Sequence, residues 1–283
     1  MYIIIKTLSR LVCMLPAALC DAIGFVIGRL SWLAVQKWRR QMAVDNVIKS
    51  GLAATPAAAE SIVRESVYRF GPMMLEVLMF PQLTKEKIDG MVKITGGEYL
   101  REALTHGRGA VLITAHSGNW ELLGATLAFH GYPIVAVVKK QSDLGADRFI
   151  NEYRTLAGMH VTYKTSVREM VRLLGEGKIV GLLMDQDAGA DGVVVDFFGR
   201  PASSPQGPAA LARMKESPIV PAFMTRNADG THEAIIHPFL WPEKTADREG
   251  DIVQTTNKLN RIIEDHIRKH PTEWFWLHNR WKV

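Results

Sequence analysis

The sequence predicts an α/β protein with a mixed, mostly parallel central sheet flanked by helices, preceded by an apolar, membrane-associating helical segment. Two observations predict this fold class. From residue 92 onward, short β-rich runs alternate with helical stretches, which is typical of a sheet covered by helices. Before that point, apolar residues crowd positions 1–36, and residues 41–90 have a helical pattern. We therefore expect a membrane-anchoring helical segment at 1–40 and one α/β domain at 41–283.

The N-terminal segment is apolar, but charges interrupt it. Its longest uncharged run, Leu11–Cys20, is shorter than the roughly 20 residues that a spanning helix needs. Trp32 and Trp38 lie close to Arg39 and Arg40, a combination that favours an interface with anionic lipid headgroups. The apolar character also continues past the small residues at which a signal peptide would be cleaved. We expect a retained segment attached to the membrane, and the alternative is a buried helical hairpin.

The following residues divide into helices and strands by their apolar periodicity. Thr55 and Pro56 are typical of a helix start, with a capping side chain followed by proline in the first turn. We expect strands at 110–115, 133–138, 179–184, 219–224 and 233–237. We expect helices near 120–130, 145–157, 166–175, 206–215 and 250–269.

The net charge of +5 and the pI of about 9.2 favour an acidic partner, such as a phosphate-bearing lipid, an acidic carrier protein or a nucleic acid. The closing WFWLHNRWK mixes aromatic and basic residues, as single-strand-binding surfaces do. It is equally compatible with a headgroup-binding surface or with core packing. Because no recognisable nucleic-acid-binding motif accompanies it, we expect no nucleic acid partner. Cys13 and Cys20 alone provide no disulfide framework, which fits a reducing compartment.

The stretch VLITAHSGNWE, residues 111–121, takes an apolar strand directly into polar residues. In a single helix, five steps of about 100° would place His116 and Glu121 on different faces. A strand–turn–helix corner would instead fold His116 back over the first helical turn, with Ser117 or Asn119 as the N-cap and Gly118 in a tight turn. A carboxylate bonded to one ring nitrogen fixes the tautomer and leaves the other nitrogen free to accept a proton.

The same pair has a purely structural interpretation, with a helix-capping glutamate and a histidine satisfied by its surroundings. The sequence contains neither a G-x-S-x-G nucleophile elbow nor an HExxH zinc motif, so neither a covalent hydrolase nor a zinc protease is indicated. A base without a protein nucleophile indicates a substrate that brings its own hydroxyl.

ITAHSGNWELLG resembles the H-x-G-N-W-E core of the bacterial lipid A late acyltransferases, the lauroyl and myristoyl transferases of lipopolysaccharide assembly. LLMDQDAG, VDFFGRPASSPQGPAALA and EWFWLHNRWK resemble further blocks of that family in the same order. The resemblance covers essentially the whole chain. The family is similar to the glycerolipid acyltransferases, which have H-x4-D where this chain has H-x4-E.

The resemblance implies an enzyme at the cytoplasmic face of the bacterial inner membrane. It would transfer a fatty acyl chain from acyl carrier protein to a hydroxyl of a phosphorylated lipid A precursor, with no metal, no cofactor and no covalent enzyme intermediate. His116 would be the general base, and Glu121 would orient and charge-stabilise it. Other acceptors stay open, namely a glycolipid, an ornithine-type lipid or a lysophospholipid. A third possibility is a membrane-binding protein without catalytic activity.

Five further residues are candidates for substrate binding. Lys139 stands where the family usually has arginine, and a lysine lacks the planar fork that binds phosphate at two points. Asp185 follows a predicted strand, where it would border the active site or simply end the strand in a turn. Arg200 is a candidate phosphate contact or an ordinary surface arginine. Asn119 and Ser204 complete the set.

Overall fold

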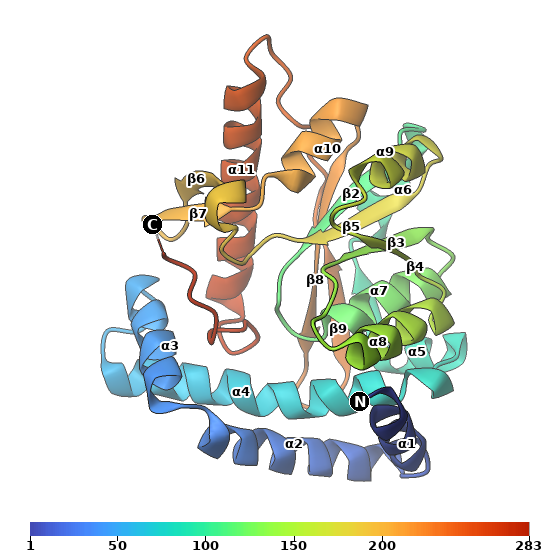
Figure 1. Ribbon diagram of the computed structural model, residues 1–283, viewed down its shortest axis with the longest axis vertical. Coiled ribbons are helices and arrows are strands. Elements are labelled where there is room, and N and C mark those ends of the chain that lie inside the picture. The colour runs from blue at the N-terminus through green and yellow to red at the C-terminus, as the bar shows by residue number, and fades with distance from the viewer. Residues whose placement is uncertain (283) are drawn as a thin grey trace.

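The computed structural model describes residues 1–282 and contains a seven-stranded sheet in the order β1-β9-β8-β2-β5-β3-β4 (Figure 1). Neighbouring strands run parallel except for β8 and β9, which are antiparallel. The predicted mixed, mostly parallel sheet is therefore confirmed. The strands are β1 (Val92–Thr95), β2 (Ala110–Thr114), β3 (Ile134–Val138), β4 (His160–Tyr163), β5 (Ile179–Leu183), β8 (Ile219–Arg226) and β9 (His232–Ile236).

Both faces of the sheet are covered, and β2 shows how. All five of its residues are buried, as expected for a parallel strand with helices on either side. Val111 and Ile113 face one core, while Ala110 and Leu112 face the other, because side chains alternate along a strand. The first core is closed by α9 (Val167–Gly175), α10 (Gly207–Lys215) and α11 (Arg248–Lys269), and the second by α5 (Lys85–Met91), α6 (Gly97–Thr105), α7 (Trp120–Phe129) and α8 (Leu144–Leu156).

The five strands and five helices that the sequence predicts between residues 110 and 269 are all present. Four strands were not predicted: β1, β4, and the hairpin of β6 (Val193–Asp196) with β7 (Pro201–Ser204). Each has only four residues, which is the lower limit of the length over which an alternating pattern can be recognised.

The N-terminal helices α1 (Tyr2–Cys13) and α2 (Ala17–Ala34) lie along one edge of the molecule, with α2 against α4 (Pro56–Leu78) (Figure 1). The two helices approach closely, because a Cβ at Gly28 would collide with the Tyr68 carbonyl and one at Gly24 with the Pro72 backbone. Thr55 caps α4 as predicted, by accepting a hydrogen bond from the Ala58 amide. The region between residues 37 and 91 is helical, with α3 (Lys37–Lys49), α4, a short 3-10 turn η1 (Phe80–Gln82) and α5.

Only one side of α2 is packed against the protein. Its buried residues Cys20, Gly24, Gly28 and Trp32 form a stripe on α4, while several large apolar side chains point to solvent. By length and composition, with a mean hydropathy of 1.5, α2 is the one helix within residues 1–282 that is long and apolar enough to cross a membrane. The boundary predicted at residue 40 falls inside α3, and the division into an anchoring segment and an α/β domain stays a prediction. The exposed apolar residues of α2 include Leu19, Val26, Ile27, Leu30 and Leu33.

Candidate active site

The stretch from His116 to Asn119 forms the predicted turn between β2 and α7. Asn119 is the N-cap of α7, and its Oδ1 accepts a hydrogen bond of 2.9 Å from the Leu122 amide. Gly118 has a φ of 57°, and a Cβ there would collide with the Met224 carbonyl, so the turn requires glycine at this position. The strand–turn–helix corner is therefore confirmed.

The carboxylate bonded to the His116 ring is Asp185. Their Nδ1 and Oδ1 atoms are 2.9 Å apart, and the His116 backbone amide donates to Asp185 Oδ2 at 3.0 Å. Trp274 also donates to Oδ2, from its indole Nε1 at 2.7 Å. Because β2 and β5 are parallel neighbours, the residues just beyond their carboxyl ends meet at the same edge of the sheet. Asp185 is only 1% exposed, so a fixed, dry carboxylate holds the imidazole.

Glu121 does not make the predicted bond to His116, which corrects that expectation. Both of its oxygens are engaged by the Arg154 guanidinium, with Arg154 Nε 2.8 Å from Oε2 and Nη2 2.6 Å from Oε1. Since α7 begins at Trp120, the next residue points toward α8, which carries the arginine. The negative charge of Glu121 nevertheless helps to raise the pKa of His116.

Opposing effects set the charge of the His116–Asp185 pair. Burial lowers the pKa of His116, but the charge and hydrogen bond of Asp185 outweigh it, and the net pKa lies above the usual 6.5. Burial raises the pKa of Asp185, but His116 and the other donors lower it by more, so the net pKa falls below the usual value. Asp185 is thus a carboxylate at neutral pH. His116 Nε2 has no partner among residues 1–282. When Nδ1 donates a hydrogen bond to Asp185, Nε2 carries no proton and is free to accept one.

Two cavities meet at His116. One, here called the apolar groove, has a volume of about 730 Å³ and is lined mainly by aliphatic and aromatic side chains of α4, α7, α8 and the strands beneath them. The other, here called the polar cavity, has room for about one water molecule, about 20 Å³, and is lined by arginine, glutamate and histidine side chains. The ring of Trp120 packs against that of His116, with centroids 4.9 Å apart, and contributes to both walls.

The other predicted site residues fall into two groups. Lys139 is exposed just after β3 and lines the apolar groove. Asn119 borders the polar cavity, but the protein occupies both ends of its amide, since Nδ2 donates to Glu76 Oε2 at 2.7 Å. Arg200 and Ser204 lie on the β6–β7 hairpin and line neither cavity. Arg200 donates to the Lys49 carbonyl at 3.1 Å.

Ser204 does not fit its predicted role in substrate binding, because it is fully buried. Its Oγ accepts from Arg280 Nη2 at 2.5 Å and from Asn260 Nδ2 at 2.9 Å. The closing aromatic segment is likewise core, since Trp274 and Trp276 are 1% and 0% exposed. Through its contact with Asp185, Trp274 also belongs to the candidate site.

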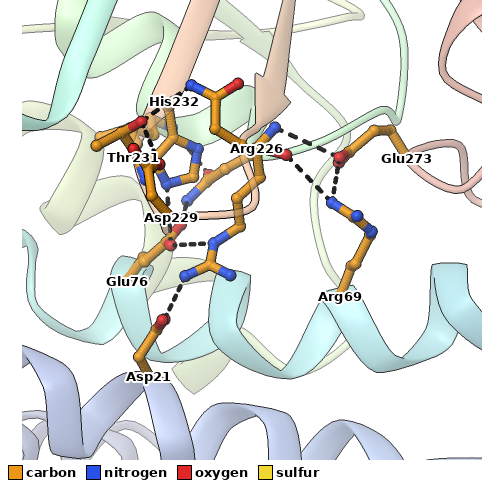
Figure 2. Close-up of polar contacts among 11 residues, drawn as sticks. Asp21, Arg69, Glu76, Arg226, Asp229, Thr231, His232 and Glu273 are labelled. Carbon is orange, nitrogen blue, oxygen red and sulfur yellow. Dashed lines mark hydrogen bonds and ion pairs between the residues drawn. The ribbon is translucent and has the colours of Figure 1, made fainter.

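A network of buried charges behind the turn was not predicted (Figure 2). Glu76 of α4 accepts from His232 Nε2 at 3.0 Å as well as from Asn119, and it lies 3.5 Å from Arg226 Nε. Arg226 also pairs with Asp21 of α2. Burial raises the pKa of Glu76, but these partners lower it by more, so Glu76 stays charged. The network therefore ties the N-cap of α7 to α4 and to the ends of β8 and β9.

A second ion pair of this network joins Arg69 of α4 to Glu273, with 2.5 Å between Nη1 and Oε1. The segment around Glu273 is fastened to the turn by its backbone. The Gly118 amide donates to the Glu273 carbonyl at 3.0 Å, and the Phe275 amide donates to the His116 carbonyl at 2.9 Å. Within residues 1–282, no three His, Cys, Asp or Glu side chains gather as metal ligands would.

Known proteins resemble this chain over most of its length. A family model described as bacterial lipid A biosynthesis acyltransferase matches residues 1–283. A phosphatidylinositol mannoside acyltransferase of Mycobacterium tuberculosis H37Rv is 30% identical over 239 residues, which is 81% of this chain and 73% of the relative. The lipid A biosynthesis lauroyltransferase of Escherichia coli K12 is 24% identical over 275 residues, 96% of this chain and 88% of that protein. The crystal structure of a 1-acyl-sn-glycerophosphate acyltransferase from Thermotoga maritima aligns over 95% of this chain and 100% of its own, with 12% identity and a TM-score of 0.41.

Proposed function

Since this chain belongs to the bacterial lipid A biosynthesis acyltransferase family, we propose that it transfers a fatty acyl chain from acyl carrier protein to a hydroxyl of a phosphorylated lipid A precursor. Acyl transfer as such follows from the family. The observation that best supports the proposal is the position of His116, which is held by a buried carboxylate where the apolar groove meets the polar cavity.

In the proposed reaction, His116 Nε2 takes the proton of the acceptor hydroxyl while the hydroxyl oxygen attacks the thioester carbonyl. The tetrahedral intermediate then collapses, the carbon–sulfur bond breaks, and the thiolate takes the proton back from His116. Asp185 keeps Nδ1 protonated and stabilises the imidazolium that forms in between. General-base assistance of this kind contributes about 10²- to 10⁴-fold. The ester forms without an acyl-enzyme, so no protein nucleophile is needed.

The apolar groove is the proposed place of the acyl chain. Its volume of about 730 Å³ lies in the range of pockets that bury a small ligand, and its walls include Met73, Val77, Leu123 and Phe149. Lys139 at its edge is the residue we propose to meet the acidic carrier protein or its phosphate-bearing arm.

A second candidate acceptor is a mannosylated inositol phospholipid. The 30% identity to the mycobacterial phosphatidylinositol mannoside acyltransferase favours it, and the reaction at His116 would be the same. The two candidates differ only in the lipid that occupies the acceptor side.

We also propose that the protein works on the cytoplasmic face of the inner membrane, with the exposed side of α2 in the lipid. Leu30 and Leu33 are 58% and 72% exposed on that side, and Trp38 is 58% exposed beside Arg39. Apolar side chains with flanking aromatic and basic residues are typical of helices that lie in a membrane interface.

The test combines purified protein, an acyl carrier protein thioester and a lipid A precursor, with phosphatidylinositol mannoside as the alternative acceptor. We expect release of carrier thiol and a lipid product heavier by one acyl group. His116→Ala should lower turnover at least 10²-fold. His160→Ala is the matched control, because His160 is half-exposed, pairs with Glu169 and lines neither cavity. Unchanged turnover in His116→Ala would exclude His116 as the base.

A further inference from the structure

The polar cavity beside His116 contains an unused hydrogen-bond acceptor. The side chain of Glu273 is 6% exposed, and its Oε1 receives Arg69 Nη1 at 2.5 Å and the Arg226 amide at 3.3 Å (Figure 2). Its Oε2 receives no hydrogen bond from residues 1–282. That oxygen lies beside the catalytic turn, 3.5 Å from where a Cβ on Gly118 would stand.

Glu273 is held rigidly relative to the base. Its carbonyl accepts from the Gly118 amide, and two residues later the Phe275 amide donates to the His116 carbonyl. His116 and Glu273 line the same cavity, which has room for about one water molecule, so a single hydroxyl next to the one at Nε2 is the size of group that can enter it and donate to Oε2. Burial raises the pKa of Glu273 by more than Arg69 and its other partners lower it. A desolvated carboxylate with an empty oxygen is stabilised by a further donor.

The charges around the cavity indicate which kind of donor fits. Arg69 and Arg226 are each paired with a carboxylate, Arg69 with Glu273 and Arg226 with Glu76 and Asp21. The walls thus offer two positive and two negative charges, apart from the histidines, and no unpaired arginine for a phosphate. A carboxylate repels a phosphate but accepts hydrogen bonds from hydroxyls.

We propose that Glu273 is an acceptor-binding residue, which receives a hydrogen bond from a hydroxyl adjacent to the one being acylated. The acceptor group at His116 is therefore a polyol or sugar ring with neighbouring hydroxyls, and not an isolated hydroxyl on an acyl chain. This inference rests on the proposed acyl transfer, and of the two proposed acceptors it favours the mannosylated inositol phospholipid over a chain hydroxyl of the lipid A precursor.

The experiment uses two lipids with the same dialkylglycerol anchor, in the same vesicles, with acyl carrier protein thioester as donor. One is a mannoside, whose hydroxyls are all on the ring, and the other is a β-hydroxyacyl ester, whose single hydroxyl is on the chain. We expect the wild type to acylate the mannoside at least about tenfold faster. Loss of a hydrogen bond to a charged group corresponds to about 10- to 100-fold, so Glu273→Ala should raise KM for the mannoside by that factor.

Glu273→Gln keeps the shape and one acceptor oxygen, so a smaller rise in KM, about 3- to 10-fold, is expected. It also keeps the test valid if the alanine variant folds poorly. Glu65→Gln is the matched control, because Glu65 also pairs with Arg69, at 3.4 Å from Nε, but does not line the cavity. Glu65→Gln should leave the rates of acylation of both lipids, the mannoside and the β-hydroxyacyl ester, unchanged.

The outcomes separate the inference from the proposed function. A wild type that prefers the chain hydroxyl, or folded Glu273 variants with unchanged KM for the mannoside, would overturn the role of Glu273 while acyl transfer stands. A wild type that acylates neither lipid, nor the lipid A precursor, would overturn the transfer itself and the inference with it.

Discussion

Asp185→Asn is the most direct test of how His116 is controlled. The change is nearly isosteric and removes only the charge and one acceptor oxygen. Asp185 accepts three hydrogen bonds, from His116 Nδ1, the His116 amide and Trp274 Nε1. Two of these donors share Oδ2, so an asparagine will place its single oxygen there. Its NH2 group then faces Nδ1.

The size of the expected loss of activity follows from the tautomer that the asparagine imposes on His116. An NH2 group beside Nδ1 requires that this nitrogen carry no proton, so the proton moves to Nε2. The base then has no lone pair for the acceptor hydroxyl, and the loss approaches the whole contribution of the general base, about 10²- to 10⁴-fold. At 1.36 kcal/mol per factor of ten, this corresponds to about 3–5 kcal/mol of transition-state stabilisation.

The pH dependence provides the second readout. His116 acts as a base only when neutral, so wild-type kcat/KM falls as the pH drops through the pKa of His116, which lies above 6.5. Without the charge of Asp185, burial outweighs the remaining charge of Glu121 and lowers the pKa of His116, so the acidic limb of any residual activity moves to lower pH. Carrier-thiol release between about pH 5 and 8 measures both effects. A variant with wild-type rate, or an acidic limb that does not move, would refute the assigned pairing.

Three other changes test separate parts of the site. Trp274→Phe keeps an aromatic ring but removes the hydrogen-bond donor to Asp185, so kcat should fall about tenfold with KM unchanged. An effect on KM alone would argue against a positioning role for Trp274. Glu121→Gln leaves the Arg154 side chain, which is 14% exposed, without its opposite charge. This should lower the free energy of unfolding by up to about 3–5 kcal/mol. A melting curve identical to that of the wild type would show that the pair does not stabilise the fold. Gly181 lines the apolar groove, and a Cβ there meets nothing closer than 3.5 Å. The leucine side chain of Gly181→Leu should therefore extend into the groove and shorten the transferred acyl chain. Mass spectra of the product that match those of the wild type would place the acyl chain elsewhere.

The sequence predicts the longer helices and strands well because their buried apolar residues recur with the period of the helix or strand. It does not show which strands are neighbours. Asp185 stands 69 residues after His116, and only the adjacency of β5 to β2 brings the two together. Glu121 was assigned to the histidine because its distance along the chain is short, whereas the start of α7 at Trp120 directs it to Arg154. An arginine on α8 has no local signal that marks it as this partner.

The arrangement around His116 also implies that chain length and acceptor choice are controlled separately. The apolar groove and the polar cavity share only four lining residues within 1–282: Phe70, Met73, His116 and Trp120. Gly181 lines only the groove and Glu273 only the cavity. The free-energy effects of changes at sites without shared partners add within about 0.3–0.5 kcal/mol. In the double variant Gly181→Leu/Glu273→Ala, the transferred acyl chain should therefore shorten as it does with Gly181→Leu alone. The KM for the acceptor should rise as it does with Glu273→Ala alone. Strong non-additivity would mean that donor and acceptor compete for one cavity, and that His116 does not separate them.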